Sequence, residues 1–313
     1  MHPLTAIATA QAQMNAIVLG KSQAVQLALT CLLANGHLLI EDQPGVGKTL
    51  LATTLAHCLG LRTARVQFAS DLMPSDITGA QIYRKDSEQF QFKAGPIFTQ
   101  VLLADEINRA PSKTQSALLQ AMEERVVSVD GVAHALPAPF FVLATQNPLS
   151  QIGTFALPES QLDRFLMRIS LGLPNAASER ALLAGQSPRS ALASLPASAS
   201  AVSVQAAQQA AAQVHVSEAL LDYVQALIAA SRSHTALAQG LSPRGALALI
   251  AASKAFAWLS SRDFATADDV QAVWMAVASH RVLAKNNAHE HSKAQNSTHS
   301  ACLDILNTTP LAQ

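Results

Sequence analysis

The chain has 313 residues, of which 50% are hydrophobic and 13% are charged; this is the balance of a globular protein and excludes a disordered one. The formal net charge is zero, so composition gives no bulk attraction to nucleic acid or to an anionic membrane, and we expect no nucleic-acid partner. The three cysteines are far apart and have no metal-ligand spacing. Since the N-terminus lacks a signal-peptide pattern and no apolar run reaches about 18 residues, we expect a cytoplasmic protein without a membrane span.

The first half of the chain predicts helices that alternate with short strands. Residues 4–34 have apolar side chains spaced three and four apart, which predicts helix. Short apolar runs predict buried strands at 37–40, 64–68, 101–104, 140–144 and 165–171, and helical patterns at 48–60, 112–125 and 159–164 separate most of them. This alternation predicts an α/β fold with a mostly parallel sheet that is covered on both faces.

Two segments interrupt the alternation and predict β-hairpins. Residues 78–92 alternate polar and apolar side chains around Lys85-Asp86-Ser87. Residues 126–135 carry Asp130-Gly131 between two short runs that contain valine, which is a strong hairpin signal. Both hairpins are either surface decoration or insertions that meet a partner or substrate.

The composition changes near Pro174, which predicts a second domain. We expect an α/β core at 1–173, a linker at 174–205 and a helical domain at 206–285. Residues 186–213 are rich in Ala, Ser and Gln and suit a linker that leads into a helix. Helical patterns lie near 216–232, 243–260 and 266–283. The polar tail at 286–313 is expected to fray.

The clearest chemical signal is a phosphate loop at residues 44–50. It follows a predicted strand, opens a predicted helix and consists of Pro44, Gly45, Val46, Gly47, Lys48, Thr49 and Leu50. A tight loop with little side-chain bulk lets backbone N–H groups converge on phosphate oxygens, where a helix N-terminus adds partial positive charge. Lys48 can reach the terminal phosphates, and the Thr49 hydroxyl can ligate Mg²⁺. The usual first glycine of this motif is replaced by Asp42, a residue that tolerates unusual backbone conformations better than most.

Two further signals complete a site for ATP and Mg²⁺. The apolar run at 101–104 ends in Asp105-Glu106, where Asp105 would hold Mg²⁺ and Glu106 would activate the attacking water. The next strand ends in Asn147-Pro148, and the amide of Asn147 can hold the same water. A solvated acidic pair and an ordinary Asn-Pro turn are the alternatives for these two motifs taken alone.

The order of these motifs resembles the AAA+ ATPases, and several stretches resemble the MoxR family within them. The resemblance covers about residues 4–285, and magnesium-chelatase ATPase subunits are similar relatives. Its most specific stretches are Asp71–Gly79, Gly95–Phe98, Asp105–Pro111, Gln115–Arg125 and Gln161–Phe165. The resemblance implies a five-stranded parallel sheet in the order 5-1-4-3-2, a small all-helical lid, and assembly into a ring of identical subunits, typically a hexamer.

The resemblance also assigns roles that the residues alone do not. Asn147 corresponds to the sensor 1 position, and Arg244 in Leu241–Gly245 corresponds to the sensor 2 position. Arg164 corresponds to an arginine finger that acts on the ATP of the neighbouring subunit, with Arg168 as a competing candidate. Gly20, in Val18-Leu19-Gly20, belongs to the segment that packs against adenine.

The function that the resemblance implies is ATP hydrolysis in a chaperone-like ring. Such a ring would remodel or mature other protein complexes, with a client protein and a partner that bears a von Willebrand factor A domain. The rival functions are an AAA+ motor on nucleic acid, a magnesium-chelatase-like ATPase subunit, and an interaction subunit that binds nucleotide only to assemble. Zero net charge argues against the first rival, and the intact Lys48, Asp105 and Glu106 argue against the last.

Overall fold

A computed structural model describes residues 2–147, 155, 157–185, 187–285 and 291–310, so that Pro148 of the Asn147-Pro148 motif lies outside the described residues. At the centre is a five-stranded sheet with the strand order β2-β5-β8-β1-β9, in which all neighbouring strands run parallel. Counted along the chain among these five strands alone, the order reads 2-3-4-1-5. This is the predicted order 5-1-4-3-2 read from the opposite edge, and the predicted α/β fold is confirmed. The five strands are β1 (Leu38–Glu41), β2 (Thr63–Gln67), β5 (Val101–Asp105), β8 (Phe141–Gln146) and β9 (Met167–Ile169).

The strands form where the sequence has short apolar runs, because central parallel strands are covered on both faces. Every residue of β5 and β8 is buried, whereas the edge strand β2 buries little besides Val66. The register pairs Gln67 with Asp105 and Glu41 with Gln146, so neighbouring strands end level with one another. The carboxyl ends of β2, β5, β8 and β1 therefore meet at one edge of the sheet.

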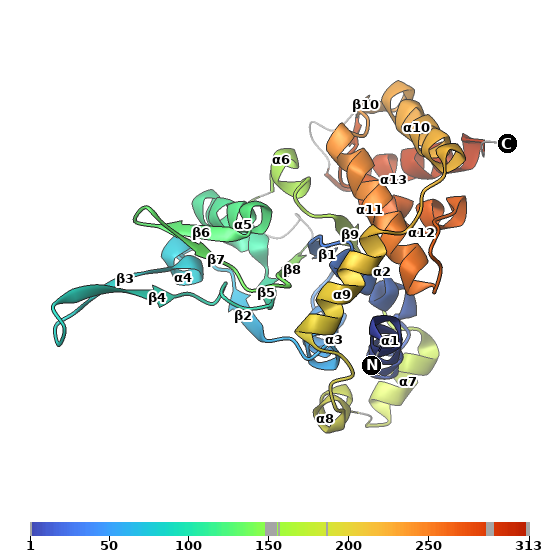
Figure 1. The fold of residues 1–313 in the computed structure, drawn as a ribbon. Coiled ribbons are helices and arrows are strands. Elements are labelled where there is room, and N and C mark those ends of the chain that lie inside the picture. Colours follow the sequence, from blue (N-terminus) through green and yellow to red (C-terminus); the bar gives the residue numbers. More distant parts are fainter. Residues whose placement is uncertain (1, 148–154, 156, 186, 286–290, 311–313) are drawn as a thin grey trace.

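Helices cover both faces of the sheet (Figure 1). One face packs in a continuous apolar cluster with α1 (Pro3–Ile17), α2 (Ser22–Leu33), α3 (Lys48–Cys58) and α9 (Ala201–Ala212). The other face packs with α4 (Pro74–Thr78), α5 (Ser112–Glu124), the 3₁₀ turn Ile107–Arg109 and the short α6 (Glu159–Leu162). Alternate residues of the strands supply the two clusters, as in Leu103 for the first and Leu102 for the second.

Both predicted hairpins are present. They are formed by β3 (Gly79–Arg84) with β4 (Gln89–Ala94), and by β6 (Val126–Val129) with β7 (Val132–Ala135). Asp130 and Gly131 at the second turn both have positive φ, which matches the twist of a tight hairpin. The β3–β4 hairpin projects away from the rest of the chain (Figure 1), and its Tyr83 and Phe90 are exposed side chains whose ring centroids lie 5.4 Å apart.

The C-terminal half is helical, as predicted, with one small exception. Residues 174–205, which were expected to link two domains, contain α7 (Ala176–Leu183), α8 (Pro188–Ser194) and the start of α9. The helices that follow are α10 (Glu218–Ser233), α11 (Pro243–Leu259) and α12 (Ala267–Ala278). A two-stranded antiparallel pair, β10 (Leu237–Gln239) with β11 (Leu283–Ala284), was not predicted, because strands of three and two residues carry no detectable alternation.

The prediction that the C-terminal tail frays is wrong. Residues His291–Thr308 form α13, and its Ala301, Cys302 and Ile305 are buried in the apolar cluster that also holds the helices of the sheet. The indole N–H of Trp274 in α12 donates to the carbonyl oxygen of Cys302 at 2.9 Å. The average composition of this segment is polar, so the sequence did not predict the packing. Three apolar side chains on one face are nevertheless enough to dock a helix. Among the residues that the structure describes, none of the helices combines the length and the apolar character that crossing a membrane requires.

Candidate active site

The predicted phosphate loop connects the end of β1 to the start of α3. Gly45 has φ +86° and Gly47 has φ +101°, a left-handed conformation that glycine adopts without a side-chain clash. Residues 43–45 are exposed, so the backbone of the loop is accessible to a ligand. Asp42 does not have a positive φ, and its presence in place of a glycine therefore causes no backbone strain. A loop of this kind at a helix N-terminus is a site at which phosphate can bind.

Lys48, the first residue of α3, is only 8% exposed. Its Nζ donates to the carbonyl oxygen of Asp42 at 2.6 Å and to Oδ1 of Asn147 at 3.1 Å. Burial lowers the pKa of Lys48, and the charges of Asp42, Asp105 and Glu106 oppose that shift. These two protein oxygens accept hydrogen bonds from the Lys48 ammonium group. A phosphate that bound there would compete with them for the same N–H donors.

Asp105 ends β5 and is held from two sides. Its Oδ2 forms an ion pair with Arg65 at 2.7 Å, and its Oδ1 accepts a hydrogen bond from the Thr145 hydroxyl at 2.5 Å. The described residues contain no cluster of three or more His, Cys, Asp or Glu side chains that could hold a metal ion. A carboxylate and the half-buried hydroxyl of Thr49 are nevertheless oxygen ligands that suit Mg²⁺, which completes its octahedron with waters and substrate phosphates. The donor set therefore fits Mg²⁺ in the company of a nucleotide.

Glu106 is the most constrained acidic side chain of the site. Its backbone has φ +57°, which is uncommon for a residue with a side chain, and its N–H donates to the Thr145 hydroxyl at 2.9 Å. Its carboxylate accepts hydrogen bonds of 2.9 Å from Asn147 Nδ2 and Gln67 Nε2 and pairs with Arg109 Nε at 2.9 Å. Asn147 thus connects Lys48 to Glu106 through the two ends of one amide, and the three predicted residues lie together.

The sequence patterns missed several residues that build this site. Thr145 bonds both acidic residues, while Arg65 and Gln67 of β2 contact Asp105 and Glu106. Asn108 is buried and donates to the carbonyl oxygen of Asn147 at 3.2 Å. The two-residue spacing of Arg65 and Gln67 places both side chains on one face of β2, and this was the available signal.

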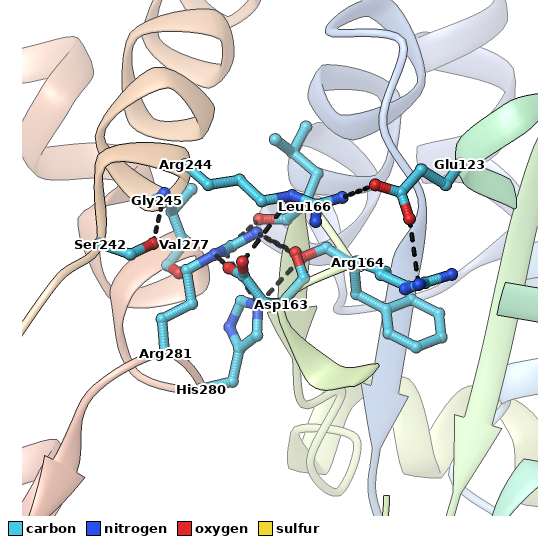
Figure 2. Close-up of polar contacts among 11 residues, drawn as sticks. Glu123, Asp163, Arg164, Leu166, Ser242, Arg244, Gly245, Val277, His280 and Arg281 are labelled. Atoms are coloured by element: carbon cyan, nitrogen blue, oxygen red, sulfur yellow. Dashed lines mark hydrogen bonds and ion pairs between the residues drawn. The ribbon is translucent and has the colours of Figure 1, made fainter. Parts of the chain in front are cut away.

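The two predicted arginines lie in a separate cluster at the boundary between the sheet domain and α11. Arg164 NH2 lies 3.1 Å from Oε2 of Glu123, and Arg244 NH2 lies 3.2 Å from Oε1 of the same carboxylate (Figure 2). Arg244 Nε also lies 3.7 Å from Oδ2 of Asp163. Among the described residues, neither arginine forms a hydrogen bond or ion pair with Lys48, Asp105 or Glu106.

Arg281 fixes the end of α12 to the segment that carries Arg164. Its side chain is 3% exposed and pairs with Oδ1 of Asp163 at 2.7 Å (Figure 2). It also donates to the carbonyl oxygens of Phe165 and Leu166. Burial lowers the pKa of Arg281, and its bond to Asp163 opposes this shift. Because the buried guanidinium of Arg281 donates to groups of the sheet domain, separating the end of α12 from that domain would leave a buried charge without partners and would be costly.

Arg168, the competing finger candidate, is engaged elsewhere. It lies in β9, where NH1 pairs with Glu41 at 3.0 Å and NH2 donates to the carbonyl oxygen of Ser279 at 3.1 Å. Gly20 lies between α1 and α2 with φ +70°, and a Cβ there would lie 2.6 Å from the Ser178 hydroxyl oxygen. Close packing against α7 thus explains the glycine, and its contact with adenine stays a prediction.

Comparison with known proteins agrees with this fold and site. Residues 37–167 match the family described as "ATPase family associated with various cellular activities (AAA)", and residues 229–299 match the AAA lid domain. The chain is 31% identical to a protein from Cytophaga hutchinsonii described as a "putative ATPase", whose crystal structure superposes with a TM-score of 0.88, covering 99% of this chain and 96% of that one. The lid match extends into α13. The fold is that of an AAA+ ATPase.

Three relatives identify the family within this class. The chain is 42% identical to Chaperone MoxR1 of Mycobacterium tuberculosis, over 85% of this chain and 73% of that protein. It is 40% identical to the YeaC protein of Bacillus subtilis, over 90% and 88%. Protein MoxR of Paracoccus denitrificans is 32% identical, over 87% of each chain. The chain belongs to the MoxR family of AAA+ ATPases.

Proposed function

We propose that this protein hydrolyses ATP to ADP and phosphate with Mg²⁺, as a ring of identical subunits that remodels other protein complexes. The observation that carries the proposal is the connected set Lys48–Asn147–Glu106 beside the phosphate loop. This set brings together a cation that can bind phosphate, a polar amide and a carboxylate that can act on water. All three lie at the edge of the parallel sheet where the strands have their carboxyl ends. Open α/β sheets bind their ligands at this edge.

The roles follow from the geometry and from general phosphoryl-transfer chemistry. The loop amides and Lys48 bind the β- and γ-phosphates. Glu106 accepts a proton from the attacking water. The oxygen of that water bonds to the γ-phosphorus while the bond between the γ-phosphorus and the ADP oxygen breaks. Asn147 positions both Glu106 and the water. Thr49 and Asp105 would hold Mg²⁺, which when bound neutralises charge on the phosphates.

The arginines are proposed to act across subunits and at the lid. Arg164 would supply positive charge to the γ-phosphate of the neighbouring subunit, and Arg244 would sense nucleotide from the lid. Their half-exposed side chains support this, because each guanidinium has donors beyond those that it gives to Glu123 and Asp163. The proposed domain division is a core at 1–173, a connection at 174–205 and a lid at 206–285.

The chaperone-like role is supported by the relative named Chaperone MoxR1. We propose a protein client and a partner with a von Willebrand factor A domain, in keeping with the family resemblance. The projecting β3–β4 hairpin, with exposed Tyr83 and Phe90, supplies a surface for such contacts.

The proposal is tested by two substitutions whose effects on binding and turnover differ. Lys48→Ala removes charge from bound phosphates and should abolish both ATP binding and hydrolysis. Glu106→Gln retains the phosphate contacts and should bind ATP normally while kcat falls, because its carboxylate acts on the water. Phosphate release and calorimetric titration measure the two quantities. Equal loss of affinity in both variants would contradict the assigned roles.

A further inference from the structure

Residues 170–173, here called the strap, carry the chain out of the sheet domain. They follow β9 directly and lead into α7. Gly172 has φ +64°, a left-handed conformation that glycine adopts without a side-chain clash. Two charged side chains that the proposed catalysis does not use hold the strap from two other segments.

Asp42 holds the amide side of the strap. Its Oδ2 accepts hydrogen bonds from Leu171 N at 2.7 Å, from Gly172 N at 2.7 Å and from the Ser170 hydroxyl at 2.8 Å. Its Oδ1 accepts one from Gln43 N at 2.8 Å. Burial opposes the charge of Asp42, but these hydrogen bonds outweigh it and keep the pKa of the carboxyl below its usual value. Asp42 is therefore ionised at neutral pH, and its bonds to the strap are charge-assisted.

Lys21 holds the carbonyl side of the same strap. Its buried Nζ donates to the carbonyl oxygens of Leu171 at 2.7 Å, Gly172 at 2.8 Å and Leu173 at 2.5 Å. All three donors of the ammonium group are therefore used on the strap. Lys21 directly follows Gly20, the predicted adenine-side residue.

Asp42 also touches the phosphate-binding lysine through its backbone. The Asp42 carbonyl oxygen accepts the 2.6 Å hydrogen bond from Lys48 Nζ. The other acceptors of Lys48 are Asn147 Oδ1 at 3.1 Å and the Gln146 carbonyl oxygen at 3.5 Å, so its three donors all face protein oxygens. A phosphate that binds Lys48 must take at least one of these donors. Asp42 therefore contacts the strap through its carboxylate and contacts Lys48 through its carbonyl oxygen, and nucleotide binding would change the second of these contacts.

We propose that Asp42 and Lys21 are positioning residues that clamp the strap and make its order depend on the nucleotide bound beside Lys48. This inference rests on the proposed ATP binding. It explains why an aspartate stands where phosphate loops usually have their first glycine, since glycine has no side chain to hold the strap. Because the strap leads towards the lid, the clamp couples the occupied nucleotide site to the chain that enters the lid.

Hydrogen–deuterium exchange of the Leu171 and Gly172 amides tests the clamp. The full-length protein is compared with and without the non-hydrolysable analogue adenylyl imidodiphosphate and Mg²⁺, and calorimetry measures binding of the analogue separately. In the wild type, the analogue should change the exchange rate of these amides about 5-fold or more, the lower end of usual coupling between sites. In Asp42→Asn and Lys21→Met, both amides should exchange fast, and the ratio between the two states should fall to about one.

The ratio of the exchange rates without and with the analogue distinguishes coupling to the nucleotide from a purely structural role. A purely structural role would speed exchange equally in both states and leave this ratio unchanged. Asp86→Asn and Lys85→Met, the same chemical changes on the exposed β3–β4 turn, are matched controls that should behave like the wild type. If Asp42→Asn does not fold, Ser170→Ala removes one hydrogen bond and keeps both charges, and it should reduce the ratio part of the way.

The outcomes distinguish this inference from the proposed function. Failure of the wild type to bind the analogue would overturn both. Normal binding with no change in exchange of the strap would overturn the clamp and leave ATP binding intact. An undiminished ratio in Asp42→Asn or, should that variant not fold, in Ser170→Ala would also overturn it.

Discussion

Thr145 joins the two acidic residues of the site through one hydroxyl group. It is fully buried, accepts the N–H of Glu106 and donates to Asp105. The first bond supports the left-handed backbone of Glu106, a conformation that persists only where its surroundings enforce it. The hydroxyl therefore sets the direction of the Glu106 carboxylate as well as that of Asp105.

Thr145→Val keeps the shape of this side chain and removes both hydrogen bonds. A buried N–H left without a partner costs about 1–3 kcal/mol. Since the loss falls on the residues proposed to act on water and to hold the metal, we expect kcat to fall about tenfold or more. Affinity for ATP should change little, because Lys48 and the loop stay intact.

Steady-state phosphate release and calorimetry measure the two effects. Thr9→Val is the matched control, because Thr9 is an exposed residue whose hydroxyl bonds only to the carbonyl oxygen of Thr5 in its own helix. A kcat within twofold of the wild type in Thr145→Val would show that the hydroxyl does not position Glu106.

At the level of elements, α13 completes the apolar core of the lid. Cys302 and Ile305 are buried, whereas Leu303 on the same helix is 39% exposed. The indole of Trp274 is fully buried beneath α13 and uses it as a hydrogen-bond acceptor. The helix is therefore held by packing on one narrow face.

Ile305→Ala should destabilise the protein by about 2–5 kcal/mol, the usual cost of emptying a buried aliphatic site. Leu303→Ala removes a side chain of the same size from the same helix and should cost less than about 1 kcal/mol. Urea unfolding followed by far-ultraviolet circular dichroism measures both. Equal shifts in the two variants would mean that α13 does not dock as described.

At the level of the whole molecule, the positions of the arginines bear on assembly. Arg164 and Arg244 share Glu123, and Arg281 fixes the end of α12 to the same segment. The arginine-bearing segment and the lid are thus joined, while the acidic site has no described ion pair with either candidate arginine. The proposed role of Arg164 across subunits predicts this separation within one chain.

We predict that Arg164→Ala and Glu106→Gln subunits, each nearly inactive alone, regain activity when mixed. A trans arginine can be worth about 10³–10⁵ in rate. In a closed head-to-tail ring, random mixing leaves roughly a quarter of interfaces with an intact Glu106 on one side and an intact Arg164 on the other. ATPase activity after subunit exchange is the measurement.

A mixture of Lys48→Ala with Glu106→Gln is the control for this experiment. Both lesions lie in the half of the interface that holds the nucleotide, so no arrangement of subunits restores a whole site and activity should stay absent. Continued inactivity of the first mixture, in rings shown to contain both variants, would argue for Arg164 acting within its own subunit.

Features that lie within one short segment could be predicted from the amino-acid sequence. The phosphate loop is a contiguous run from Pro44 to Leu50, and strands such as the one that ends in Asp105 are recognisable as short apolar runs. Parallel strands end at a common edge, so the meeting of Lys48, Glu106 and Asn147 also followed from the order of motifs.

Contacts between distant segments could not be predicted in this way and are seen in the folded chain. Asp42 meets the strap some 130 residues later, Glu123 meets two arginines from two domains, and α13 docks through three side chains in a polar stretch. The spacing of residues in the sequence does not predict these contacts, because each one depends on how separately folded segments pack against one another. Lys48, Asn147 and Glu106 therefore lie together as expected, while the residues that hold them in place and connect them to the lid became known only from the packed chain.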